Sequence, residues 1–136
     1  MDIAAIKPSA WGPGAWKLIH YAALAYPENP TNEDKQNYMN FFTSLQYILP
    51  CPACAKNFKK NLEKFPLRES LDNNKTLFQW TVDIHNEVNK ESNKKEYSYE
   101  EALEIYTKPY KEKYDILFIV GFVILIGLIL FYITNN

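Results

Sequence analysis

The sequence predicts an all-α protein, in which a four-helix bundle with a short fifth helix precedes a transmembrane helix. Three observations predict this fold class. Apolar residues recur at three- and four-residue spacing along the polar part of the chain, which is typical of amphipathic helices. No segment shows the sustained two-residue alternation of a β-strand. The third observation is an uncharged run of apolar and aromatic residues at positions 116–133 of the 136-residue chain.

Prolines and capping residues divide the polar part of the chain into helices. Pro27 closes the first helix, and Thr31 is a plausible N-cap for the second. Ser98 begins a capping box that opens a short fifth helix. This helix could continue into the apolar segment, although Pro109 favours a kink or break. The expected helices cover 11–26, 31–49, 51–64, 76–91 and a short stretch from 98 through 106, with a polar loop at 66–74.

The uncharged segment is long enough to cross a membrane. Its 18 residues would form a helix about 27 Å long, and a domain this small could hardly bury such a helix as core. Three lysines precede it, at positions 108, 111 and 113, and only three residues follow it. The positive-inside rule then leaves the rest of the chain on the cytosolic side, as in a tail-anchored protein. The amino end lacks the pattern of a signal peptide.

We therefore expect a domain at 1–108, a juxtamembrane linker at 109–115 and a tail anchor at 116–133. The 15 basic and 16 acidic residues give a net charge of −1, which excludes the broad basic surface that nucleic-acid binding usually needs. The two cysteines lie in one tetrapeptide, Cys51–Cys54, which excludes a secreted fold held together by disulfides.

The two cysteines allow three interpretations. A redox pair needs only these residues, and the start of a helix favours the thiolate form of a cysteine. A zinc site needs four ligands, and the other candidates, His20 and His85, lack the spacing of a compact zinc knuckle. The third interpretation is an inert pair of reduced cysteines. The spacing favours the redox pair, without a metal.

Two helical stripes carry polar and aromatic groups. Gly12, Trp16 and His20 recur every four residues on the first helix, and His85 and Asn89 share a face of the fourth. Taken singly, such residues are most often core residues. Polar groups beside apolar surface need partners, so two facing stripes would hold either a hydrogen-bond network or a polar aromatic ligand.

A basic and aromatic segment follows the fourth helix. Lys94 and Lys95 suit the end of a helix and could meet a phosphate, although solvated surface is an equal alternative, and Tyr97 and Tyr99 add aromatic faces. Together with the stripes and the dithiol, these residues indicate a dithiol coupled to a planar redox cofactor that carries phosphates.

Three motifs in this order resemble the Erv/ALR family of FAD-linked sulfhydryl oxidases. They are WGPGAWKLIH at 11–20, CPAC at 51–54 and HNEVN at 85–89, and the chain looks most like the compact members of large cytoplasmic DNA viruses. The resemblance implies a helical bundle that binds FAD, works as a homodimer and catalyses 2 RSH + O2 → RSSR + H2O2. The substrates would include viral proteins that need disulfide bonds.

The resemblance also implies residue roles. Cys54 would be the thiol next to the flavin, and Cys51 would exchange with the incoming dithiol. Gly12 would let the first helix approach FAD, Lys94 would lie near its phosphates and Tyr99 near its adenine. The expected cofactor-binding residues are Gly12, Trp16, His20, Cys54, His85, Val88, Asn89, Lys94, Lys95 and Tyr99.

The sequence departs from the family pattern at two points. Pro13 replaces the usual basic residue after the motif glycine, and there is no second dithiol to act as a shuttle. We therefore expect direct exchange with a separate dithiol carrier, such as a thioredoxin-like protein. The alternatives are a flavin-free CxxC exchange protein and a membrane-tethered helical adaptor in which the cysteines are incidental.

Overall fold

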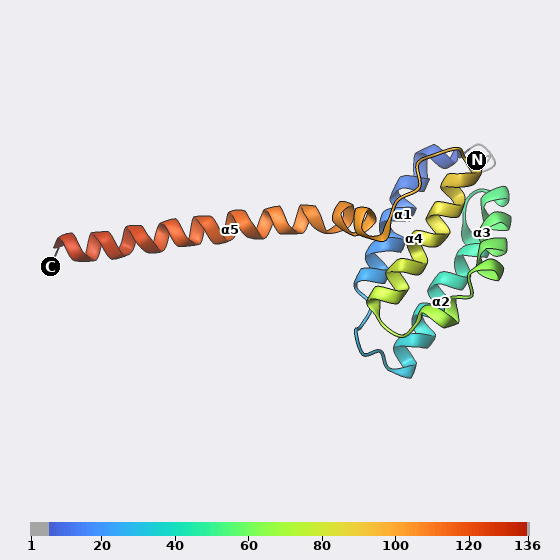
Figure 1. Ribbon diagram of the computed structural model, residues 1–136, viewed down its shortest axis with the longest axis horizontal. Coiled ribbons are helices and arrows are strands. Elements are labelled where there is room, and N and C mark those ends of the chain that lie inside the picture. Colours follow the sequence, from blue (N-terminus) through green and yellow to red (C-terminus); the bar gives the residue numbers. More distant parts are fainter. Residues whose placement is uncertain (1–5, 136) are drawn as a thin grey trace. The chain divides into compact units, whose positions relative to one another are not determined.

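The computed structural model describes residues 6–135, apart from the side chains of 109–115 and 135. The described residues form helices and no strand, which confirms the all-α class. The elements are α1 (Pro8–Leu24), α2 (Asn32–Ile48), α3 (Pro52–Lys64), the 3-10 helix η2 (Leu67–Ser70), α4 (Asn74–Glu91) and α5 (Tyr99–Asn135) (Figure 1).

Two helices begin at reciprocal capping boxes. At α2, the Thr31 hydroxyl accepts a hydrogen bond from the Asp34 N–H at 3.1 Å, and the Asp34 carboxylate accepts one from the Thr31 N–H at 2.8 Å. At α4, Asn73 and Thr76 make the same pair of bonds, at 3.0 and 3.2 Å. The cap predicted at Thr31 is therefore confirmed. The fourth helix begins two residues earlier than expected, because Thr76 is the third residue after its Asn73 cap.

The chain between α3 and α4 is more ordered than the expected polar loop. It contains η2, whose Leu67 is buried, as is Leu71 directly after it. The Tyr26 hydroxyl donates a hydrogen bond to the Leu71 carbonyl at 3.1 Å. These contacts fix the connection against the end of α1.

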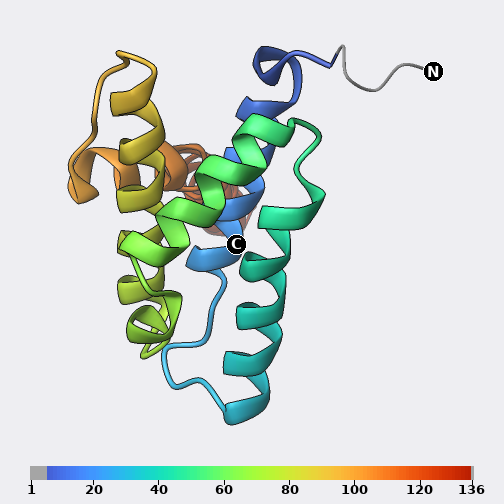
Figure 2. The same ribbon diagram turned by 90° about the vertical axis from the view of Figure 1, so that its right-hand side faces the viewer.

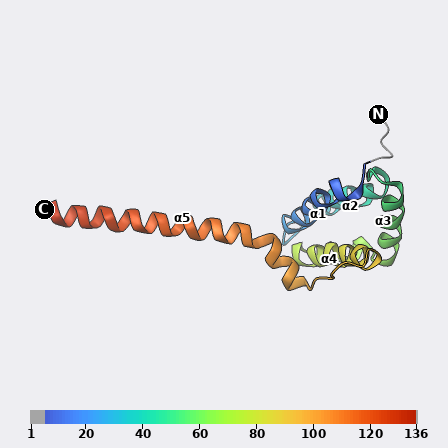
Figure 3. The ribbon, with the colours of Figure 1, turned by 90° about the horizontal axis from the view of Figure 1, so that it is seen from above.

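Four helices, α1 to α4, form the bundle. The most extensive pairings are α1 on α4 and α2 on α3. Figure 2 shows these helices side by side, and Figure 3 shows α1 and α2 along one side of the bundle and α4 along the other. Phe42 of α2 is fully buried, and its ring meets the Trp80 ring of α4 edge-on at 5.1 Å between centroids.

The chain divides into two compact units, Met1–Tyr99 and Glu100–Asn136. The expected short fifth helix and the apolar segment are continuous in α5, so Pro109 does not end the helix. A proline removes one intrahelical hydrogen bond, which can bend a helix without terminating it. Within α5, residues Ile116–Thr134 have a mean hydropathy of 3.2 and none of them is buried. By length and composition this stretch could cross a membrane.

Candidate active site

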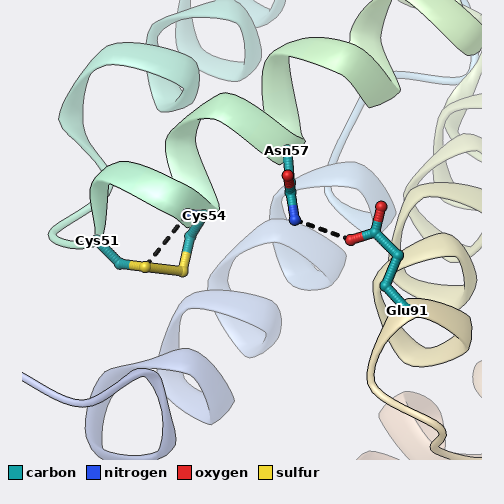
Figure 4. Close-up of a disulfide and its surroundings, with 4 residues drawn as sticks. All are labelled: Cys51, Cys54, Asn57 and Glu91. Carbon is teal, nitrogen blue, oxygen red and sulfur yellow. Dashed lines mark hydrogen bonds between the residues drawn. A yellow bond between two sulfur atoms is a disulfide. The ribbon is translucent and has the colours of Figure 1, made fainter.

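The two cysteines form a disulfide at the start of α3 (Figure 4). Cys51 is the N-cap of the helix, and its sulfur accepts a hydrogen bond from the Cys54 N–H at 3.2 Å. Pro52 occupies the first helical position, where its fixed φ suits the helix and its missing N–H costs nothing. The expected position of the dithiol at a helix start is confirmed. When the disulfide is reduced, the amide and the helix dipole favour a thiolate at Cys51.

The two predicted stripes meet between α1 and α4. Nε2 of His20 lies 2.9 Å from Nδ1 of His85, and Nδ1 of His20 lies 2.8 Å from the hydroxyl of Thr81. His20 is only 1% exposed and Thr81 is fully buried, so these bonds satisfy groups that water cannot reach. These bonds therefore form a hydrogen-bond network that joins the two stripes.

Aromatic contacts hold the same rings in place. Trp16 stacks on His85 with 3.9 Å between the ring centroids and 7° between the planes. His20 makes tilted contacts with Trp16 at 5.9 Å and with Phe78 at 5.7 Å. Trp16, His20 and His85 together form what we call the histidine cluster.

Both histidines of the cluster are neutral at pH 7. Burial, and secondarily the neighbouring His85, lowers the pKa of His20 to about 3. Burial, and secondarily the charge of Lys94, lowers the pKa of His85 to about 4. The cluster therefore works through hydrogen bonds and ring faces rather than through charge.

The basic segment after α4 is held by side chains of that helix. Asn86 donates a hydrogen bond to the Tyr97 carbonyl at 2.8 Å and accepts one from the Tyr97 N–H at 2.9 Å. Asn93 turns the chain with a φ of 51°, a left-handed conformation that asparagine tolerates well at a helix end. Lys94 and Lys95 are exposed on this segment. Lysines presented in this way could meet phosphates.

Tyr99 is anchored as well. Its hydroxyl donates a hydrogen bond to the Asp83 carboxylate at 2.7 Å. Desolvation raises the pKa of Asp83, and the bond from Tyr99 partly opposes this effect.

The remaining predicted residues differ in their surroundings. Asn89 is buried on the α4 stripe and Val88 is half-buried beside it. A Cβ on Gly12 would meet no atom within 4 Å, so this stretch of α1 borders open space. No described interaction joins Cys51 or Cys54 to the histidine cluster: the cysteines bond to each other and belong to α3.

Three residues of this region were missed by the reasoning from the sequence: Thr81, Asp83 and Asn86. Thr81 lies four residues before His85 and so shares its helical face, which was a usable signal. Asn86 lies inside the HNEVN motif, but no feature of the motif shows that its side chain binds Tyr97. Nothing in the sequence marks Asp83 as the partner of Tyr99.

The region suits the large planar cofactor that the resemblance implies. The indole Nε1 of Trp11, next to Gly12, is buried without a hydrogen-bond partner among the described residues. An unused donor of this kind can serve a ligand. The cluster adds neutral hydrogen-bonding rings, and Lys94 and Lys95 add two positive charges. The residue types therefore fit a flavin nucleotide, which is planar, polar and anionic.

Comparisons with known proteins agree with this description. The family model described as "Erv1 / Alr family" matches residues 13–111. A probable FAD-linked sulfhydryl oxidase of Acanthamoeba polyphaga mimivirus is 45% identical over 104 residues, which cover 76% of this chain and 73% of that protein. An FAD-linked sulfhydryl oxidase of African swine fever virus is 33% identical over 96 residues, covering 71% of this chain and 79% of that protein. The crystal structure of the yeast Erv1 core aligns with a TM-score of 0.68 and 26% identity, covering 82% of this chain and 89% of that chain.

Proposed function

Because the chain belongs to the Erv1/Alr family, we propose that it is an FAD-linked sulfhydryl oxidase. The reaction is 2 RSH + O2 → RSSR + H2O2, and its purpose is disulfide formation in viral proteins. The observation that carries this proposal is the disulfide at the start of α3. A disulfide placed at a helix start can accept the electrons of a substrate dithiol, and the similarity to viral oxidases supports the cofactor.

The thiol exchange can be followed atom by atom. A substrate thiolate attacks the sulfur of Cys51, which forms a mixed disulfide and releases the sulfur of Cys54. A second substrate thiolate then attacks the substrate sulfur of the mixed disulfide, which releases the substrate disulfide and the Cys51 thiolate. The Cys54 N–H, bonded to the Cys51 sulfur, stabilises this leaving group. FAD, when bound, takes two electrons from the dithiol and passes them to O2.

We assign the cofactor to the two stripes and the basic segment. Trp16, His20, His85 and Asn89 would supply ring faces and hydrogen bonds, with Gly12 and Val88 beside them. Lys94 and Lys95 would bind the phosphates and Tyr99 would lie near the adenine. Cys54 would be the cysteine next to the flavin. Two observations support this assignment. The rings of Trp16 and His85 stack with 3.9 Å between their centroids, and α1 borders open space at Gly12.

We propose the following organisation for the whole chain. Residues 1–108 form the oxidase domain, 109–115 a linker and 116–133 a tail anchor that leaves the oxidase domain on the cytosolic side of a host endomembrane or virion membrane. The hydropathy of Ile116–Thr134 supports the anchor. The enzyme would act as a homodimer. Since the chain has no second dithiol, it would receive electrons directly from a dithiol carrier, for example a thioredoxin-like protein.

The decisive measurement is an absorption spectrum combined with oxygen uptake. We expect a yellow protein whose colour is released on denaturation, and oxygen uptake with a dithiol substrate that stops in both Cys51→Ser and Cys54→Ser. A colourless protein that still exchanges disulfides would instead support the flavin-free alternative. If the biological effect of the protein survived the replacement of both cysteines by serine, that result would support the adaptor.

The roles of the two cysteines need a separate test. A thioredoxin-like protein that keeps a single cysteine can attack the Cys51–Cys54 disulfide of the wild type but cannot resolve the product, so a mixed disulfide on Cys51 should accumulate and be identified by peptide mass spectrometry. Trapping through Cys54 alone would reverse the two assignments.

A further inference from the structure

A continuous chain of hydrogen bonds runs from the backbone of α4 through Thr81 to both histidines. The Thr81 hydroxyl donates to the Phe78 carbonyl at 2.6 Å. A hydroxyl has only one hydrogen, so once it is donated the oxygen can only accept. The atom that faces this oxygen is Nδ1 of His20, at 2.8 Å. Nδ1 of His20 must therefore carry a hydrogen.

The proton position of His20 determines that of His85. In a neutral imidazole one nitrogen carries a hydrogen and the other is an acceptor, so Nε2 of His20 is bare. Its partner is Nδ1 of His85, at 2.9 Å, which must then donate. Nε2 of His85 is consequently bare as well. Burial keeps both rings neutral, because it lowers the pKa of each histidine well below 6.5.

The bare nitrogen of His85 is held in a fixed orientation. Trp16 stacks on the ring at 3.9 Å, and the bond from Nδ1 to His20 prevents rotation about the ring axis. No described residue forms a hydrogen bond with Nε2 of His85. The ring therefore presents an acceptor, and not a donor, to a ligand at the cluster.

We propose that Thr81 is a positioning residue for the cofactor: it fixes both histidines in the Nδ1-protonated tautomer, so that His85 presents a bare Nε2 to a hydrogen-bond donor of FAD. The inference rests on the proposed function in that FAD is taken as the ligand of the cluster. FAD has suitable donors in its amino, imide and hydroxyl groups. Thr81 itself touches no ligand and acts only through the two rings.

Replacing Thr81 with valine should remove its bond to His20 and reverse the direction of hydrogen donation between His20 and His85. Valine has nearly the same shape, but it offers no acceptor to Nδ1 of His20 in a site that excludes water. His20 would then carry its hydrogen on Nε2 and donate to Nδ1 of His85. His85 would be left with a hydrogen on Nε2, which would oppose a donor of the cofactor. Thr81→Ser keeps the hydroxyl and should restore the original arrangement.

Nitrogen NMR can read these tautomers directly. The chain has only two histidines, so the full-length protein in detergent, labelled with 15N-histidine and freed of any tag, gives two imidazole signals. We expect the Nδ1-protonated pattern for both rings in the wild type and in Thr81→Ser, and the Nε2-protonated pattern in Thr81→Val. The matched control is Thr43→Val, because the Thr43 hydroxyl also donates to a helical carbonyl, at 2.6 Å, without touching a histidine.

The second readout is the dissociation constant of FAD. Thr81→Val should bind FAD about tenfold more weakly, and Thr81→Ser should bind like the wild type. Nε2-protonated rings in the wild type would overturn the proposal even if Thr81→Val did not fold. Unchanged tautomers in a folded Thr81→Val would overturn it too, and reversed tautomers with unchanged FAD affinity would overturn the role in cofactor binding. A wild type that binds no FAD would instead refute the proposed function, and the NMR result would still stand.

Discussion

Asn86 provides the clearest quantitative test of how the basic segment is held. Its amide makes both a donor and an acceptor bond to the backbone of Tyr97, at 2.8 and 2.9 Å. Each such bond stabilises a folded arrangement by about 0.5–1.5 kcal/mol, so Asn86→Ala should cost about 1–3 kcal/mol of local stability. Hydrogen exchange measures this local opening, and the Tyr97 amide should exchange roughly 5- to 150-fold faster in the variant.

Two further variants sharpen this test. Asn86→Asp keeps an acceptor for the Tyr97 N–H but places an oxygen against the Tyr97 carbonyl, so its effect should at least match that of Asn86→Ala. Asn40→Ala is the control, because the Asn40 side chain accepts a hydrogen bond from the exposed side chain of Gln36 and not from the backbone of another segment. Since Lys94 and Lys95 lie on the segment that Tyr97 anchors, FAD affinity should fall together with the exchange protection. Unchanged exchange at Tyr97 in Asn86→Ala would refute this reasoning.

Three other outcomes follow from the bundle. Burial lowers the pKa values of His20 and His85 to about 3 and 4 in the folded state, so the unfolded chain takes up protons first as the pH falls. In urea unfolding, the contribution of the two histidines to the free energy of unfolding should be constant above about pH 6.5 and should fall from there to about pH 3, with a shallower loss in His85→Gln. Trp80→Phe removes the indole bond to the Phe65 carbonyl, at 2.9 Å, and should lower the free energy of unfolding by about 1–2 kcal/mol. Phe42→Ala empties a fully buried site and should cost about 3–5 kcal/mol; a loss below 1 kcal/mol in the same urea titration would contradict the packing described.

The helices of the bundle could be predicted from the sequence because their signals are local. The Thr31 capping box and the proline after Cys51 act on the residues next to them, and both predicted starts agree with the structure. The start of α4 was placed two residues too late because no local pattern marks Asn73 as the cap, whereas its bonds with Thr76 in the structure do. The sequence left the continuity of α5 open, because a proline lowers helix stability without deciding whether the helix ends.

The candidate site was predictable only in part for a different reason. Four-residue spacing places Trp16 and His20 on one face of α1, and His85 on one face of α4, whatever the rest of the chain does. Which atoms then meet depends on the register between the two helices, and no local pattern encodes it. With another register between α1 and α4, Thr81 could have been a packing residue. In the observed register its hydroxyl accepts the hydrogen bond of His20.

The dithiol and the histidine cluster lie on different helices, so their relation depends on how α3 is held against α4. Polar contacts among the described residues join these helices at several points, which include an ion pair between Lys64 and Glu87 at 2.7 Å. Near one end of α4, Asn57 donates to the Glu91 carboxylate at 2.9 Å, only three residues after Cys54 (Figure 4). In the first half of α4, the Trp80 indole donates to the carbonyl of Phe65, the residue that follows α3. Because α4 also carries His85, the helix that orients the cluster also holds the middle and the C-terminal end of α3. A change in the packing of α4 would therefore reach both the helix of the dithiol and the proposed cofactor site.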